Sequence, residues 1–323
     1  MRRTIALFVV AMLLLVPTIG SANPNGVGDG TFDAQCGGAC HGDADMNRSS
    51  ASSVVVSGPS TAYEGLPTSV DVTVSNIETT VSGLLGIFLL SDLSGAGDTP
   101  ADDGWAIVSN SEGGTQNYVE VLIEPGQNEH TVSWTLRAPA TGNYELHAAI
   151  HHGTQDGREA PFFGSSLEPI QVNVVPVPED LPRLSPTFEP PVARTVGEVT
   201  SVQLSTQAVN VVQVEWRVSG GPAQTASVVQ VDQSTWEFEL PASLQPVTVE
   251  WRAHLQGEGP EQSTPWFALQ SENPSWTVDE TAAYVQSLAM LLLFMVAFMS
   301  LQRRDEDPIE TTKEDAFALE VEH

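Results

Sequence analysis

Two cysteines and a histidine lie within one short turn near the start of the chain. Cys36, Cys40 and His41 stand in the string CGGACH, and the chain contains no other cysteine. In c-type haem attachment, two cysteine sulfurs form thioethers with the haem vinyl groups, and the histidine that follows ligates the iron. The same side chains can instead form a small disulfide, or bind another metal such as copper or zinc. The residues leave these three chemistries open.

The spacing of the two cysteines differs from the usual one. Three residues, Gly37 to Ala39, separate them here, where c-type attachment usually has two. The two glycines among these residues permit the irregular backbone that a longer loop needs. The order of the residues therefore indicates a variant motif, Cys-x3-Cys-His, which would attach haem c with His41 as the proximal ligand.

A distal iron ligand would have to come from elsewhere in the chain. Met46 follows the motif on the same loop, and three histidines, His147, His151 and His152, lie at the end of one predicted strand. The period of two along a strand places His147 and His151 on the same face. These four residues are the candidate distal ligands. The competing interpretation of the histidines is a solvated strand end with no ligand role.

Two apolar segments predict the compartment. Residues 1–22 carry two arginines, an apolar stretch and small residues in the order of a secretory signal peptide. Residues 281–302 are 22 residues without a charge, which at about 1.5 Å per residue suffices for a transmembrane helix. Two arginines follow it, so the positive-inside rule places the acidic tail, 303–323, in the cytoplasm. We expect a single-pass protein of the cell membrane whose bulk lies outside the cytoplasm.

The part of the chain between these segments is strongly acidic. Residues 23–280 contain 33 acidic residues against seven arginines and no lysine, a net charge of −26. Such a charge repels nucleic acid, which excludes nucleic-acid binding. Solubility in salty surroundings explains the charge as well as a cationic partner does.

An all-β architecture is predicted for the same part, because short runs rich in Val, Ile and aromatic residues alternate with turn residues. Residues 23–49 form the loop segment with the Cys-Cys-His motif. Two tandem β-sandwiches of immunoglobulin or fibronectin character are expected at 50–176 and 193–272, joined by a proline-rich linker at 177–192. The predicted strands are 52–57, 68–75, 84–90, 105–108, 118–123, 131–137, 144–151, 170–175, 199–204, 211–218, 227–231, 236–240 and 247–254.

Two local patterns refine this prediction. Residues 141–144, Thr-Gly-Asn-Tyr, resemble the tyrosine corner of immunoglobulin-like sandwiches, with Leu146 where antibody domains have their second cysteine. The strings VEWRVSG and VEWRAHL begin at Val214 and Val249. We interpret them as two strands that present alternating faces.

The order of these features resembles the reelin-like extracellular domains called choice-of-anchor V. The likeness covers about residues 23–175, with a sandwich that begins SSVVVSGPSTAYEG and later contains LHAAIHHGTQDG. The family's Cys-x-x-Cys-His is matched with one extra residue, and its Ala-Ala stretch before a Gly-rich loop is matched by Ala148, Ala149, Gly153 and Gly157. The resemblance implies a cell-surface module with a C-terminal anchor.

Motifs of hydrolases, nucleotide-binding enzymes and zinc proteases do not occur in the sequence, which favours a non-enzymatic protein. Two functions follow from the residues. The first is a membrane-tethered haem-binding or electron-transfer module with a redox partner. The second is a cell-surface interaction or structural protein in which Cys36 and Cys40 form a disulfide.

Overall fold

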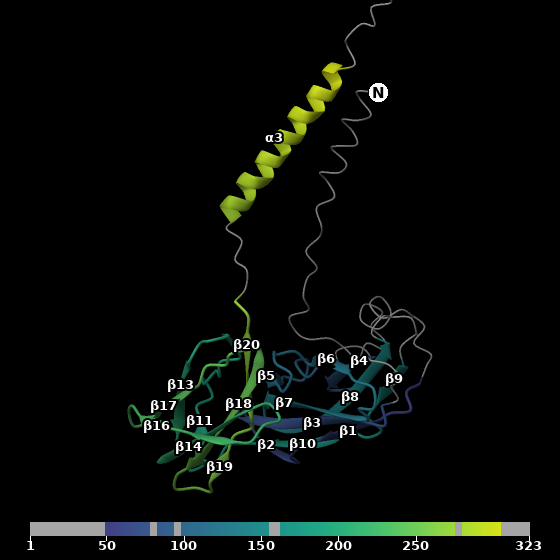
Figure 1. Cartoon of the computed structure of the whole chain (residues 1–323). Helices are drawn as coiled ribbons and strands as arrows, with labels where there is room; N and C mark the ends of the chain where they lie inside the picture. Colours follow the sequence, from purple (N-terminus) through teal and green to yellow (C-terminus); the bar gives the residue numbers. More distant parts are fainter. Residues whose placement is uncertain (1–48, 78–82, 94–97, 155–161, 275–279, 305–323) are drawn as a thin grey trace, which may run out of the picture. The chain divides into compact units, whose positions relative to one another are not determined.

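The computed structural model describes residues 49–77, 83–93, 98–154, 162–274 and 280–304. The chain divides into two compact units, Met1–Asn273 and Pro274–His323. The described strands all belong to the first unit, and the one described helix belongs to the second (Figure 1). The predicted signal peptide, the Cys-Cys-His motif and most of the acidic tail lie outside the described residues.

The first ten strands form two sheets, which we call the N-terminal sandwich. One sheet has the order β1-β3-β7-β5, and the other has the order β2-β10-β8-β4-β6 with β9 paired to β8. The strands are β1 (Ser53–Ser57), β2 (Thr61–Tyr63), β3 (Pro67–Ser75), β4 (Gly83–Leu90), β5 (Ala106–Asn110), β6 (Tyr118–Ile123), β7 (Glu129–Arg137), β8 (Gly142–Thr154), β9 (Phe162–Ser165) and β10 (Ile170–Val175).

Alternation of apolar and polar residues builds the core of this sandwich. In β3, Val70, Val72 and Val74 are fully buried while the residues between them are partly exposed. They share one hydrophobic cluster with side chains from the facing sheet, such as Ile87 on β4. Tyr144 donates a hydrogen bond from its hydroxyl to Ala140 O at 2.9 Å, which is the contact of a tyrosine corner. The predicted all-β sandwich character is therefore confirmed.

The next ten strands form a second pair of sheets, the C-terminal sandwich. Its sheets have the orders β11-β13-β17-β16 and β12-β20-β18-β14-β15, with β19 paired to β18. Trp251, Phe238 and Phe267 fill its core. The strands are β11 (Arg183–Leu184), β12 (Ala193–Thr195), β13 (Thr200–Gln207), β14 (Val211–Val218), β15 (Gln224–Ala226), β16 (Val228–Gln230), β17 (Thr235–Leu240), β18 (Val247–Gln256), β19 (Gln262–Ser263) and β20 (Phe267–Glu272).

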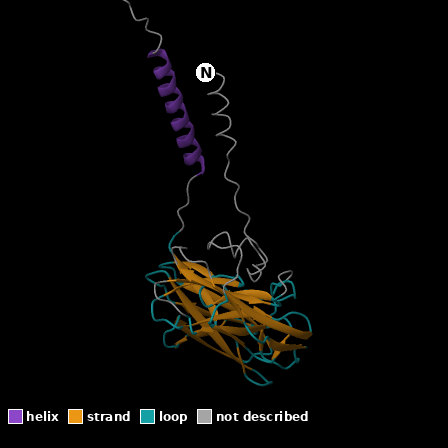
Figure 2. Ribbon diagram, turned by 90° about the vertical axis from the view of Figure 1, so that its right-hand side faces the viewer, coloured by secondary structure: helices purple, strands orange, loops and turns teal. Residues whose placement is uncertain are grey.

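The two sandwiches have similar topologies, and Figure 2 shows their strands as stacked layers. They differ in the strand that follows β4 or β14: β5 pairs with β7 in the other sheet, whereas β15 pairs with β14 itself. In each, a short strand pairs in parallel with the last strand of the sandwich: β2 with β10, and β12 with β20. The central strand β8 lies between β4 and β10, as β18 lies between β14 and β20. The faces of β4 and β8 are therefore structurally equivalent to those of β14 and β18, which permits a direct comparison of their side chains.

Contacts between the two sandwiches involve the segment predicted as a linker, 177–192. This segment contains β11, and its Leu181, Leu184 and Phe188 are buried. Arg137 on β7 donates hydrogen bonds to Gly65 O, Pro186 O and Phe188 O at 2.8–3.0 Å, which connects the N-terminal sandwich to this segment. Further hydrogen bonds between the sandwiches run from Thr135 Oγ1 to Trp266 O at 2.7 Å and from Ala268 N to Ser109 Oγ at 3.2 Å.

The second unit contains helix α3 (Glu280–Arg304). Its described side chains are those of Thr281 and of residues 284–299, and all of these are exposed, including Leu288, Leu293 and Phe294. Among the described residues, no helix has the combination of length and apolarity required to cross a membrane. The predicted span, 281–302, extends beyond the described side chains.

Candidate functional site

The predicted site residues divide into two groups in the structure. Cys36, Cys40, His41 and Met46 lie outside the described residues, whereas the three strand histidines lie on β8. The description of the site therefore begins from these histidines and from the face of the sheet that each one occupies.

The histidines of β8 point to different faces. Leu146, Ala148 and Ile150 belong to the core between the two sheets, so His147 and His151 lie on the outer face. They share one face, as predicted. Four residues along a strand correspond to about 13 Å, so these two imidazoles cannot ligate one metal ion together. His152 lies at an inward-facing position of β8, in line with Leu146, Ala148 and Ile150. The structure does not bring the three histidines together as one ligand set.

His151 is the buried histidine of the three, with 4% of its surface exposed. It pairs in register with Gly86 on β4, and a Cβ atom at Gly86 would overlap the edge of its ring that carries Nε2. Three aromatic rings surround the imidazole, with centroid distances of 5.0 Å to Phe88, 5.8 Å to Tyr118 and 6.0 Å to Phe163. The glycine thus provides the space in which this ring lies against the sheet.

A hydrogen bond fixes the His151 ring from the far side of β4. Nε2 of His151 lies 3.2 Å from the hydroxyl oxygen of Tyr118 on β6. Because β4 lies between β8 and β6, the imidazole reaches across Gly86 to make this contact. Three neighbouring strands therefore contribute to the position of one side chain.

An apolar patch continues from His151 along the same outer face. Phe88, Leu90 and Ala149 are at most 1% exposed and form a cluster separate from the core, with Leu93 and Tyr118 packed against it. We call these residues, together with His151, the outer-face cluster. Its burial is unusual, because the outward face of an antiparallel sheet is commonly polar and solvated.

The segment that carries the Cys-Cys-His motif joins the fold beside this cluster. Ser49 and Ser50 are the first described residues, and Ser50 N donates to Phe163 O at 2.6 Å. Ser50 Oγ lies 2.8 Å from Nε2 of His152. Ser49 is eight positions after His41, so the chain between them spans at most about 26–29 Å. His41 can therefore reach the outer-face cluster.

The other two histidines have different surroundings. His152 stacks on Phe162, with the ring planes 17° apart and the centroids at 5.2 Å. Nε2 of His147 lies 3.6 Å from a carboxylate oxygen of Glu145, and its Nδ1 has no hydrogen-bond partner among the described residues. His147 pairs in register with Leu90, at the end of the cluster away from Ser50.

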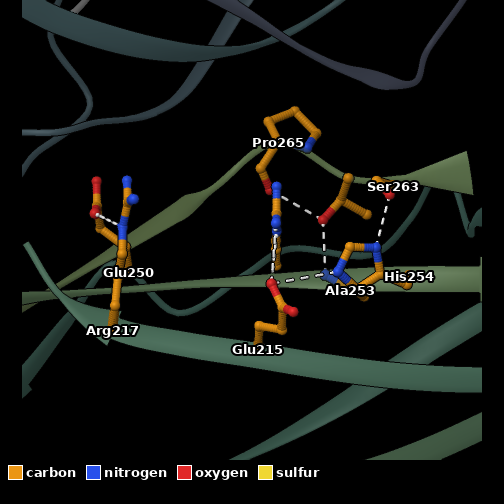
Figure 3. Close-up of polar contacts among 9 residues, drawn as sticks. Glu215, Arg217, Glu250, Ala253, His254, Ser263 and Pro265 are labelled. Carbon is orange, nitrogen blue, oxygen red and sulfur yellow. Dashed lines mark hydrogen bonds and ion pairs between the residues drawn. The ribbon is translucent and has the colours of Figure 1, made fainter. Parts of the chain in front are cut away.

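The equivalent outer face of the C-terminal sandwich is charged. The two VEWR strings pair antiparallel, so Glu215 faces Arg252 and Arg217 faces Glu250 across β14 and β18 (Figure 3). Arg252 donates to Glu215 at 3.0–3.1 Å, and Arg217 Nε donates to Glu250 at 2.6 Å. The predicted alternation of faces in these strings is confirmed, and their pairing with each other is a feature that the sequence interpretation missed.

Trp266 and His254 complete this charged network. Both guanidinium groups stack on the Trp266 ring, at 4.2 Å for Arg217 and 4.6 Å for Arg252. His254 Nε2 lies 3.4 Å from the Glu215 carboxylate, and its Nδ1 lies 2.7 Å from Ser263 Oγ. Hydrogen bonds from Arg252 and then His254 lower the pKa of Glu215. The carboxylate therefore stays ionised to lower pH than a free one.

His254 lies on the outer face of β18, as His151 lies on the outer face of β8. His151 lies between Gly86 and Phe163, as His254 lies between Gln213 and Ser263. Around His151 the outer face is aromatic and buried, whereas around His254 it is charged and partly exposed. The same fold thus permits either an apolar or a charged outer face. Of the two described sandwiches, the N-terminal one has the apolar face.

Within the ranges that the structure describes, no group of three or more His, Cys, Asp or Glu side chains is arranged to hold a metal ion. His151 fits as a single additional ligand of haem: it is an imidazole in aromatic, apolar surroundings, close to where the motif joins the sheet. A histidine on an exposed strand edge would lack these aromatic and apolar neighbours.

No protein-family model and no curated protein matches the chain. Among solved structures, it is similar to an ASH/PapD-like domain of human CEP192 (PapD-like domain 7), with 11% sequence identity and a TM-score of 0.26. The match covers 39% of this chain and 87% of that domain.

Proposed function

We propose that this chain is a membrane-anchored extracytoplasmic protein whose N-terminal immunoglobulin-like sandwich holds a covalently attached haem. Cys36 and Cys40 form the thioether bonds, His41 is the proximal ligand and His151 is the distal ligand. Bound in this way, haem c supplies one-electron transfer, and the protein contributes the ligands, their orientation and apolar surroundings.

One observation carries this proposal: the outer-face cluster on β4 and β8 is aromatic and buried, and His151 is the imidazole within it. The equivalent face of the second sandwich shows that the fold itself does not require an apolar surface at this position. Aromatic and aliphatic side chains are the surroundings that a large apolar cofactor requires. The cluster also lies within reach of His41.

Among the described candidates, position and surroundings favour His151 as the distal ligand. His152 contacts Ser50 and Phe162 on the inward-facing side of the strand alternation. His147 lies about 13 Å further along the strand and contacts the Glu145 carboxylate. Only His151 combines burial with aromatic neighbours, which are the conditions under which an axial imidazole is shielded from water.

Intact-mass measurement together with a pyridine-haemochrome spectrum tests attachment. The full chain, produced with a haem-attachment system, is expected to gain the mass of one haem and to show the haemochrome absorbance. A C36S/C40S double variant serves as the control and is expected to show neither. A wild-type chain that has lost two hydrogens and shows no absorbance would instead support a disulfide, and with it a cell-surface interaction or structural protein.

The membrane anchor in this proposal is helix α3. From Tyr284 to Met299 its described side chains are predominantly apolar and exposed, so they require a lipid or protein environment to leave water. We expect the full chain to remain in the membrane fraction after alkaline carbonate washing. A variant truncated after Asn273, which lacks α3, is expected in the soluble fraction. Release of the full chain by carbonate would contradict the anchor.

A further inference from the structure

A cavity of about 370 Å³ lies between the two sandwiches. Residues of β2 and β3 in the N-terminal sandwich and of β11, β18 and β19 in the C-terminal sandwich line it, and we call it the junction cavity. We propose that the junction cavity binds a small organic carboxylate, and that Arg183 recognises its negative charge. This site is independent of haem, because no residue of its lining belongs to the outer-face cluster.

The lining of the junction cavity has the composition of a small-molecule site. Four prolines contribute to it together with Tyr63, Leu66, Leu184 and Leu255, and serine, threonine and glutamine residues supply polar groups. Among the described residues of the lining, Arg183 is the only charged one. Sites for small molecules are mostly apolar with few polar groups, commonly lie between domains, and have volumes of about 300–1,000 Å³. The volume of this cavity therefore limits its ligand to a small molecule.

Hydrogen bonds to uncharged groups hold the guanidinium of Arg183 in place. Its Nη1 lies 2.9–3.3 Å from the carbonyl oxygens of Pro178, Glu179 and Leu181. Its Nε donates to Gln207 Oε1 at 3.1 Å. Its Nη2 has no hydrogen-bond partner among the residues that the structure describes. The side chain is therefore oriented in advance, while its positive charge is not neutralised and one nitrogen can still donate to a ligand.

An arginine without a carboxylate partner is unusual in so acidic a region, where residues 23–280 contain 33 acidic residues. Three other described arginines form ion pairs with glutamates at 2.6–3.7 Å: Arg137–Glu189, Arg217–Glu250 and Arg252–Glu215. Arg183 forms no ion pair with any described carboxylate, and its neighbours Glu179 and Asp180 line a separate hollow together with Glu258. Because a guanidinium matches a carboxylate in charge and in hydrogen bonding, Arg183 favours an anionic ligand over a neutral one.

Ligand-observed NMR titrations of the full chain test this site with phenylacetate and with phenylacetamide, a neutral probe of nearly the same shape. We expect saturable binding of phenylacetate and an affinity for phenylacetamide that is lower by about tenfold or more, because a hydrogen bond between charged groups is lost. Arg183→Met is expected to weaken phenylacetate binding by about the same factor and to leave phenylacetamide binding unchanged. Arg252→Met removes an equal charge outside the cavity and is expected to change neither affinity.

A second variant tests the location of the site without changing charge. Thr68→Trp places a large side chain in the lining and is expected to abolish binding of both probes. Phenylacetate at ten times its dissociation constant is also expected to slow protease cleavage within 177–192 by about tenfold, because Arg183 and Leu184 of that segment line the cavity.

Three results would overturn the inference. The first is the absence of saturable phenylacetate binding, or equal affinities for the two probes. The second is an Arg183→Met variant that binds phenylacetate as the wild type does, or that loses both probes, since Arg183 would then shape the cavity and not recognise charge. The third is unchanged binding in Thr68→Trp or unchanged cleavage within 177–192, either of which would place the ligand elsewhere.

Discussion

At the scale of single residues, His151 differs from the other histidines of β8 because a glycine on the neighbouring strand makes room for it. Sequence alternation predicted that it shares a face with His147, and the buried Leu146, Ala148 and Ile150 show that this is the outer face. Sequence could not predict its burial or its contact with Tyr118. Both depend on the pairing of β8 with β4 and of β4 with β6, which are contacts between residues far apart in the chain.

Gly86→Ala tests this dependence on the glycine. The new methyl group overlaps the His151 ring, so we expect the free energy of unfolding to fall by about 1–3 kcal/mol, as for other overpacked sites. Chemical denaturation of the full chain measures the change.

A double-mutant cycle supplies the control for that variant. With His151→Ala already present, the overlap is gone, so adding Gly86→Ala is expected to cost markedly less than it does alone. If Gly86→Ala lowers the free energy of unfolding equally in both backgrounds, the glycine is needed for the backbone conformation and not for room for the imidazole.

At the scale of elements, most long strands were predicted and most short ones were not. The exceptions are β20 (Phe267–Glu272), which was missed, and β16 (Val228–Gln230), which lies within the predicted strand 227–231. Runs such as 68–75 and 131–137 have clear alternation, and they correspond to β3 and β7. The short strands β2, β11, β12 and β19 have two or three residues each, too few for any periodicity to be seen. Their existence depends on a neighbouring strand that offers hydrogen bonds, which is tertiary information.

The repeated VEWR string illustrates the same limit. The alternation of residues in the two copies predicted two strands. The pairing of the glutamate in one copy with the arginine in the other depends on the register between β14 and β18, which the sequence does not show. The two resulting ion pairs are chemically alike but differ in burial. Glu250 is 5% exposed, whereas about a third of the Glu215 side chain is exposed.

This difference predicts unequal effects for two matched substitutions. Arg217→Met leaves the buried Glu250 carboxylate without its partner, and we expect a loss of about 1–3 kcal/mol in the free energy of unfolding. Arg252→Met leaves the more exposed Glu215 solvated, and its expected loss is below about 1 kcal/mol. Urea denaturation at neutral pH compares them. A larger loss for Arg252→Met would contradict the role assigned to burial.

At the scale of the whole molecule, the sequence predicted an acidic, all-β region between the two apolar segments. It did not predict how the two sandwiches contact each other. The prolines of 177–192 indicated a linker, but three buried side chains of that segment and the hydrogen bonds from Arg137 depend on surfaces that only the folded sandwiches provide. The predicted signal peptide and membrane span remain predictions.

Arg137→Met is expected to loosen this junction. Its guanidinium donates hydrogen bonds to Gly65 O in the N-terminal sandwich and to Phe188 O in segment 177–192. Losing such hydrogen bonds lowers the free energy of unfolding by about 1–3 kcal/mol. Protease cleavage within 177–192 should therefore become roughly tenfold faster or more, if it proceeds through local opening. Arg183→Met is the matched control, because most of the hydrogen bonds of Arg183 go to carbonyls of its own segment. Equal acceleration in both variants would exclude a special role for Arg137.

The most direct test of the central claim, that the outer face of the N-terminal sandwich is the haem site, is the spin state of the ferric haem-loaded chain. Absorption spectra would compare the wild type with His151→Ala, His147→Ala and His152→Ala. The account predicts low-spin haem in the wild type and in the last two variants, and conversion to high spin in His151→Ala alone. A low-spin spectrum that persists in His151→Ala would contradict it.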